Sequence, residues 1–149
     1  MLDYTTMSET YQTDFYAWAM EQAALLRAGR LSSADVANIA EEIESMGRTE
    51  RRELVNRLAV LLLHLLKWRF QPGFRSPSWN STIREQRIRL RSHLRDNPSL
   101  KAKLDEALAE AYELAVIGAA RETGLPESDF PKSSPFRCEQ AIDDRFWPD

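Results

Sequence analysis

Residues 54–70 form the most apolar stretch of the chain, and their apolar side chains cover most of a helix circumference. A helix on a protein surface keeps a polar face, so a helix that is apolar almost all round has to be surrounded by other helices. The pattern therefore predicts a helix at the centre of a bundle. His64 interrupts the stretch, which brings one titratable ring close to the predicted core, shielded from bulk water.

Apolar residues recur at helical spacing on both sides of this stretch, between residues that typically begin or end helices. Asp14 and Ser76 are suitable N-caps, and Gly29 and Gly124 suit helix ends. We expect helices over about residues 13–28, 32–47, 50–70, 76–96 and 97–122.

The second of these helices has one apolar face. Val36, Ile39, Ile43 and Met46 follow one another at i, i+3, i+7 and i+10, and this face is expected to point into the bundle. Gly47 then favours a break before the central helix, although one interior glycine costs a helix only about 1 kcal/mol relative to alanine.

The C-terminal segment, residues 125–149, combines helix-breaking prolines with large apolar side chains. We expect it to wrap the bundle as an irregular tail with at most one short helix, because so many apolar groups would be costly to leave in water. No stretch has the alternation of apolar and polar residues that is typical of a β-strand. The sequence predicts an all-α fold: a single helical domain over 1–149, a bundle of about five helices, with residues 1–12 as a flexible N-terminus.

The charge distribution is uneven, although the net charge is only −3. Residues 48–103 carry 14 Lys or Arg and four Asp or Glu, against 6 and 19 in the rest of the chain. A basic block can bind phosphates or be covered by acidic helices of the same chain, and the overall balance favours the second reading. Arg84, Arg91 and Arg95 form a candidate basic ridge, but no aromatic residues interleave with it, which disfavours nucleic acid as a partner.

Compartment signals are few. The N-terminus lacks the basic and apolar regions of a signal peptide, and no apolar run approaches the ~20 residues that span a bilayer. Cys138 is the one cysteine, so the chain has no internal disulfide. We expect a cytoplasmic protein without a membrane partner.

Three polar residues on predicted inward faces are weak candidates for a catalytic site: Asp14, Glu42 and His64. Carboxylates and an imidazole facing one interior are the parts of an acid-base pair or a metal site. The alternative is structural, since a buried histidine needs hydrogen-bond partners in any case. No Glu-x-x-His repeat accompanies His64, so no metal or cofactor is assigned.

Several segments together resemble an uncharacterised bacterial and cyanobacterial family, the domain of unknown function 29 family. The resemblance implies a compact helical protein of about this length and supplies no activity, substrate or catalytic residues. It spans most of the chain and is carried by Thr13-Asp14-Phe15-Tyr16-Ala17-Trp18, Ala40-Glu41-Glu42-Ile43-Glu44-Ser45-Met46-Gly47, residues 61–68, Ser78-Trp79, Ile83-Arg84-Glu85-Gln86 and Glu122-Thr123-Gly124-Leu125-Pro126.

By elimination, the sequence favours a binding or interaction module that uses an exposed helical face to bind a protein partner or a second copy of itself. Its uneven charge could orient such an association. Two alternatives stay open. One is a metal-dependent or acid-base enzyme using Asp14, Glu42 and His64, and the other is a nucleic-acid-binding protein using the basic ridge on residues 76–96.

Overall fold

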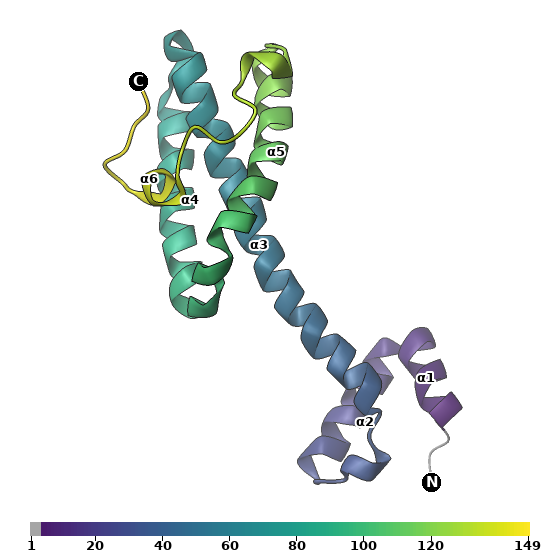
Figure 1. Ribbon diagram of the computed structural model, residues 1–149. Helices are drawn as coiled ribbons and strands as arrows, with labels where there is room; N and C mark the ends of the chain where they lie inside the picture. Colours follow the sequence, from purple (N-terminus) through teal and green to yellow (C-terminus); the bar gives the residue numbers. More distant parts are fainter. Residues whose placement is uncertain (1–3) are drawn as a thin grey trace. The chain divides into compact units, whose positions relative to one another are not determined.

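The protein is all-α, as predicted: the described residues, 4–149 of this computed structural model, with side chains from residue 9 onward, contain helices and no strand (Figure 1). Short 3₁₀ helices at Leu31–Ser33, Pro72–Phe74, Pro98–Lys103 and Glu127–Asp129 lie between the longer elements. The α-helices are α1 (Tyr4–Thr13), α2 (Phe15–Arg27), α3 (Val36–Phe70), α4 (Pro77–Asp96), α5 (Leu104–Thr123) and α6 (Cys138–Ile142).

The chain divides into two compact units, with the boundary between Thr49 and Glu50. Unit 1, up to residue 49, contains α1, α2 and the first part of α3, and unit 2, from residue 50, contains the rest. This division does not test whether residues 1–149 form a single domain, so the single domain stays a prediction. The segment predicted to be flexible, residues 1–12, falls partly outside the described residues and otherwise lies in α1.

The predicted break at Gly47 is wrong, because α3 runs without interruption from Val36 to Phe70. Its start is also later than expected, since residues 31–33 form a 3₁₀ helix. A glycine inside a helix costs about 1 kcal/mol, and an unbroken ladder of hydrogen bonds in so long a helix outweighs that cost.

The predicted helix ends are largely confirmed. Asp14 caps α2 by accepting a hydrogen bond from the Ala17 N–H at 3.1 Å, and Ser76 caps α4 through the Trp79 N–H at 3.2 Å. Gly124 ends α5 with a left-handed φ of 77°, which a residue with a side chain rarely adopts. The fifth helix begins differently, because residues 98–103 form a 3₁₀ helix before α5.

The leucine-rich part of α3 lies at the centre of unit 2, as predicted. Ile83 and Leu90 of α4 are completely buried with it, and α5 adds a row of buried alanines. Small side chains on α5 let the helix backbones approach closely: a Cβ on Gly118 would lie 2.4 Å from the Leu63 side chain. The fully buried leucines of α3 are Leu54, Leu58, Leu61, Leu62, Leu65 and Leu66.

The C-terminal tail packs against the helices of unit 2, which confirms that it wraps the bundle. Phe130 and Phe136 are buried in the core, and α6 is its one short α-helix within the described residues. Arg87 of α4 is completely buried and donates from Nε to the Ala141 carbonyl at 2.7 Å and from Nη2 to the Phe146 carbonyl at 2.6 Å. This contact between α4 and the tail was not predicted.

Candidate functional site

Unit 1 is organised around a buried carboxylate. Asp35 is 1% exposed, and its Oδ2 accepts from Trp18 Nε1 at 3.0 Å and from Asn38 Nδ2 at 2.8 Å. Its backbone N–H donates to Gln22 Oε1 at 2.7 Å. Buried polar groups are tolerated when they are hydrogen-bonded, so these contacts tie α2 to the start of α3.

The side of α3 that faces α1 and α2 is therefore polar. Asn38 and Glu42 follow Asp35 at i+3 and i+7, and the Tyr11 hydroxyl of α1 donates to Glu42. The prediction that this part of α3 buries its apolar face is wrong. The physical reason is that the hydrogen bonds of Asp35 and Glu42 hold α1 and α2 against the adjoining, polar face of the helix.

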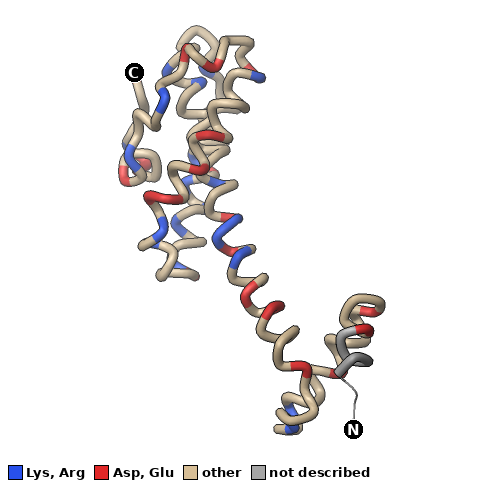
Figure 2. The backbone as a smooth tube through the Cα atoms, turned by 45° about the vertical axis from the view of Figure 1, so that its right-hand side comes forward, with Lys and Arg blue, Asp and Glu red and all other residues tan. Residues whose placement is uncertain are grey.

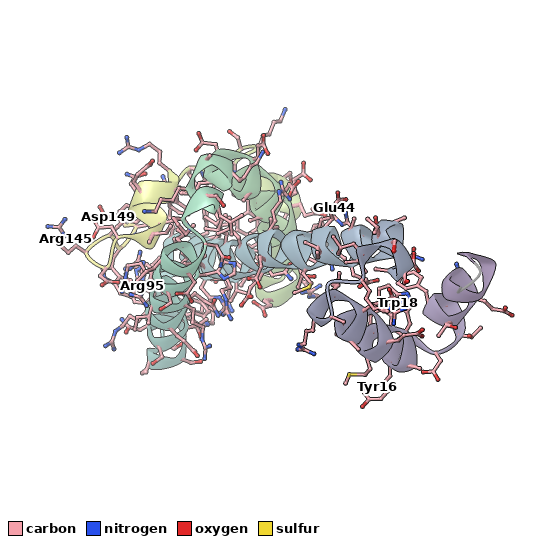
Figure 3. The ribbon with its side chains drawn as sticks, turned by 90° about the horizontal axis from the view of Figure 1, so that it is seen from below. Tyr16, Trp18, Glu44, Arg95, Arg145 and Asp149 are labelled. Carbon is pink, nitrogen blue, oxygen red and sulfur yellow. The ribbon has the colours of Figure 1, made fainter. Side chains whose placement is uncertain are left out.

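The apolar face is left uncovered within the described residues. Val36, Ile43 and Met46 are 60%, 63% and 68% exposed, and Ile39 beside them is half-buried. We call these four residues the apolar seam. Tyr16 of α2 also projects outward, whereas Trp18 lies against the start of α3 (Figure 3).

The three candidate catalytic residues take different partners. Asp14 is exposed and caps α2, and Glu42 contacts Tyr11, both in unit 1. His64 lies in unit 2, where it is half-buried at the edge of the core, and its Nδ1 contacts the Val60 carbonyl of its own helix at 2.8 Å. Burial lowers the pKa of His64. A joint site of Asp14, Glu42 and His64 stays a prediction.

The arginines of the candidate basic ridge are exposed on α4, but two of them have partners in the same unit. Arg91 pairs with Asp144 of the tail at 2.8 Å, and Arg95 donates to Ser92 at 3.1 Å. Figure 2 shows basic residues along α4, and acidic residues over the first part of α3. Arg91 thus serves in part to hold the tail.

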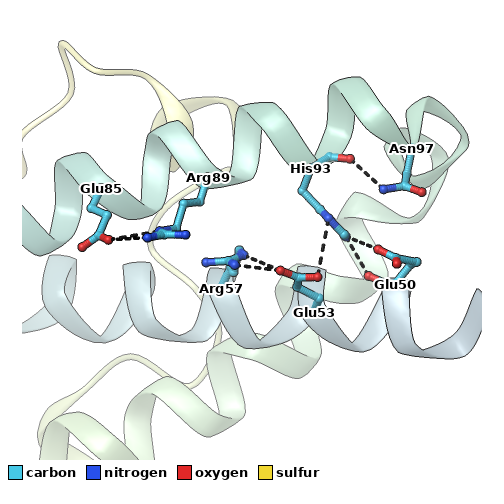
Figure 4. Close-up of polar contacts among 7 residues, drawn as sticks. All are labelled: Glu50, Glu53, Arg57, Glu85, Arg89, His93 and Asn97. Atoms are coloured by element: carbon cyan, nitrogen blue, oxygen red, sulfur yellow. Dashed lines mark hydrogen bonds and ion pairs between the residues drawn. The ribbon is translucent and has the colours of Figure 1, made fainter. Parts of the chain in front are cut away.

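A different cluster of polar residues joins α3 to α4 in unit 2 (Figure 4). Glu50 and Glu53 lie one turn apart on α3, and His93 faces them from the last turn of α4. One potential ligand atom from each of the three residues lies within 4.8 Å of the others. We call these three residues the Glu–His cluster.

The histidine of this cluster is 8% exposed and has a defined orientation. Its Nε2 lies 2.8 Å from the Glu50 main-chain carbonyl, and its Nδ1 lies 3.8 Å from Glu53 Oε2. Because a carbonyl only accepts, Nε2 carries the hydrogen. Glu53 Oε1 accepts two hydrogen bonds from Arg57 at 2.9 and 2.7 Å, and these lower the pKa of Glu53.

The Glu–His cluster borders a cleft of about 540 Å³, which Arg57, Arg89 and Asn97 also line. Asn97 donates to the His93 carbonyl at 3.1 Å, which ties the end of α4 to the loop after it. The sequence pattern did not connect His93 with Glu50 and Glu53. The i, i+3 spacing of two glutamates was the available signal, but nothing in the sequence shows which helix face they meet.

Comparisons with known proteins give a family and no activity. No curated protein and no solved structure matches the chain. Among the described residues, no helix is both long and apolar enough to cross a membrane. The model of the family named Domain of unknown function DUF29 matches residues 10–147. The chain therefore belongs to the DUF29 family, as its sequence motifs predict.

Proposed function

We propose that the chain is a protein-binding module, and that the apolar seam of α3 binds the same seam of a second copy. The observation that carries this proposal is the exposure of Val36, Ile43 and Met46. Large exposed apolar side chains grouped on one face are typical of interaction surfaces. The proposal keeps the cytoplasmic location expected from the lone Cys138.

The spacing of the seam suits a helix as its partner. Positions i, i+3, i+7 and i+10 are the a and d positions of a heptad, which interdigitate with the same positions of another helix. Ala40 and Gly47 are small and exposed on α3, and a Cβ added to Gly47 would meet nothing within 4 Å. Small residues beside a seam allow two helix backbones to approach closely.

The charges near the seam are compatible with a second copy. Glu41 and Glu44 both pair with Arg48 of the same helix, at 2.8 and 3.7 Å, and Glu42 is the acceptor for Tyr11. Arg48 thus offsets part of the acidic charge beside the seam, and the remaining carboxylates lie outside the four seam residues. Closed dimers use the same patch on both chains, so a self-complementary seam is a natural two-fold interface.

The alternatives have less support. Asp14 and Glu42 already serve as a cap and a hydrogen-bond acceptor, and two arginines of the basic ridge have partners within unit 2. An enzyme built on the first set or a nucleic-acid surface built on the second would have to release these contacts.

Sedimentation equilibrium over a concentration series tests the proposal. We expect the wild-type chain to dimerise, and Ile43→Glu to weaken dimerisation at least about tenfold, because it places a charge in the apolar seam. Ile117→Glu makes the same change at an exposed isoleucine of α5 and should leave dimerisation unchanged. A wild-type chain that is monomeric throughout, or a dimer that Ile43→Glu does not weaken, would overturn the proposal.

A further inference from the structure

The Glu–His cluster has a geometry that the interaction proposal does not use. In the neutral ring, the hydrogen on His93 Nε2 is donated to the Glu50 carbonyl, which leaves a lone pair on Nδ1. That lone pair faces Glu53 Oε2 across 3.8 Å. Two acceptor atoms thus face each other, at a separation too long for a shared proton to form a hydrogen bond.

We propose that Glu50, Glu53 and His93 bind a divalent first-row metal cation between α3 and α4. Metal–nitrogen and metal–oxygen bonds of about 2.0–2.2 Å span a gap of 3.8 Å between two ligand atoms comfortably. One imidazole nitrogen with two carboxylates is a ligand set that Zn²⁺ and Mn²⁺ both accept.

The surroundings of His93 match those of a metal-binding histidine. Such a histidine usually donates its second ring N–H to a carbonyl or carboxylate, which fixes the tautomer and aims the free nitrogen at the metal. The Glu50 carbonyl has this role here. The burial of the ring limits its rotation, so Nδ1 is held in place before the cation arrives.

Arg57 contacts only one of the two carboxylate oxygens of Glu53. Its guanidinium binds Oε1, which leaves Oε2 directed toward His93. The positive charge of Arg57 opposes the cation, which makes a modest affinity the expected result.

Glu50 supplies the adjustable ligand. Its side chain is 49% exposed, and one of its oxygens lies 3.7 Å from His93 Nε2. One ligand atom of Glu50 already lies within 4.8 Å of ligand atoms of Glu53 and His93, so rotation of this exposed side chain can bring its carboxylate to the cation. The cleft beside the cluster opens to solvent and leaves room for water molecules to complete the coordination.

Calorimetric titration of the untagged, chelator-treated full chain with Zn²⁺ and with Mn²⁺ tests the proposal. We expect one of the two ions to bind at one site per chain. His93→Gln and Glu53→Gln should each weaken binding at least about tenfold, since the loss of even an outer contact of a metal site has an effect of that size. His64→Gln removes the other histidine of the chain and should leave the affinity unchanged.

Circular dichroism of each variant checks that it folds. Glu50→Gln changes an exposed side chain, so it keeps the test decisive if His93→Gln unfolds, and it too should weaken binding. Three results would overturn the proposal: no stoichiometric binding to the wild-type chain, binding that the Glu–His variants leave unchanged, or binding lost in His64→Gln.

Discussion

The two units of the molecule are each stabilised by a different kind of interaction. Unit 2 has a continuous core in which the leucines of α3 pack against α4, α5 and the tail. Unit 1 is smaller, and its most buried residues include Gln22 and Asp35 beside Trp18. Unit 2 is therefore stabilised mainly by apolar burial, whereas unit 1 depends on hydrogen bonds to one carboxylate.

A single helix contributes to both units, which makes the difference instructive. The seam from Val36 to Met46 and the stretch from Leu54 to Leu66 both have helical apolar periodicity. The first is exposed and the second is buried. An apolar face predicts that something should cover it, but only the fold decides whether the cover comes from the same chain.

Core truncation should give the largest difference between the units. Leu62→Ala removes a completely buried side chain of unit 2 and should lower the free energy of unfolding by about 2–5 kcal/mol. Leu31→Ala removes an exposed side chain of unit 1 and should change it by no more than about 0.5 kcal/mol. Urea unfolding measures both, and similar losses would contradict the contrast.

The polar centre of unit 1 should be the next most sensitive point. Asp35→Ala leaves the Trp18 and Asn38 donors without their acceptor and should cost about 3 kcal/mol. Hydrogen exchange should then accelerate in α2 and residues 36–46, while residues 54–66 stay protected. Asp14→Ala, the same change at a helix cap, should cost only about 1 kcal/mol. Equal effects of the two variants would mean that Asp35 is not the organising residue.

Replacing two helical glycines by alanine should affect stability differently at an open helix surface and at a packed one. Gly47→Ala should stabilise the protein by up to about 1 kcal/mol, because the new Cβ meets nothing within 4 Å. Gly118→Ala should stabilise it less or destabilise it, since its Cβ would lie 2.4 Å from Leu63 Cδ1. Thermal unfolding at low protein concentration compares them, and a larger gain at Gly118 would refute this account.

The pH dependence of stability should show how far the dry interior of unit 2 extends. Burial lowers the pKa of His64 below its unfolded value. Its contribution is therefore fully present above the unfolded pKa of about 6.5 and is lost as the pH falls through the lower folded value. We expect His64→Gln to reduce slightly the loss of stability between pH 7 and pH 5. An unchanged pH profile would indicate a well-hydrated ring.

The sequence predicted most of the fold because its signals are local. The caps at Asp14 and Ser76, the stop at Gly124 and the leucines of α3 each act within one helix or its ends. The error at Gly47 is local to one helix, whereas the error at the seam comes from tertiary contacts. Gly47 was expected to break a helix that tolerates it, and the seam was expected to be covered by helices that hydrogen bonds hold elsewhere.

The Glu–His cluster could not be predicted because it depends on tertiary contacts between two helices. Its three residues come from two helices, and the inward polar residues singled out from the sequence were others. Helical projection identifies which side chains share a face, but it does not say how a neighbouring helix is rotated. His93 approaches Glu50 and Glu53 because of the way α4 packs on α3, which no local pattern encodes.

Arg87 connects the last residues of the chain to the interior of unit 2 by hydrogen bonds. The carbonyls of Ala141 and Phe146 take the place of water around a fully buried guanidinium. Its carbon atom, Cζ, lies 5.2 Å from the centroid of the Trp147 ring. A shortened chain without residues 141–149 would leave the Arg87 guanidinium without these two carbonyl acceptors. Truncation should therefore destabilise unit 2, and an apolar replacement of Arg87 should remove the part of that loss that comes from the unpaired charge.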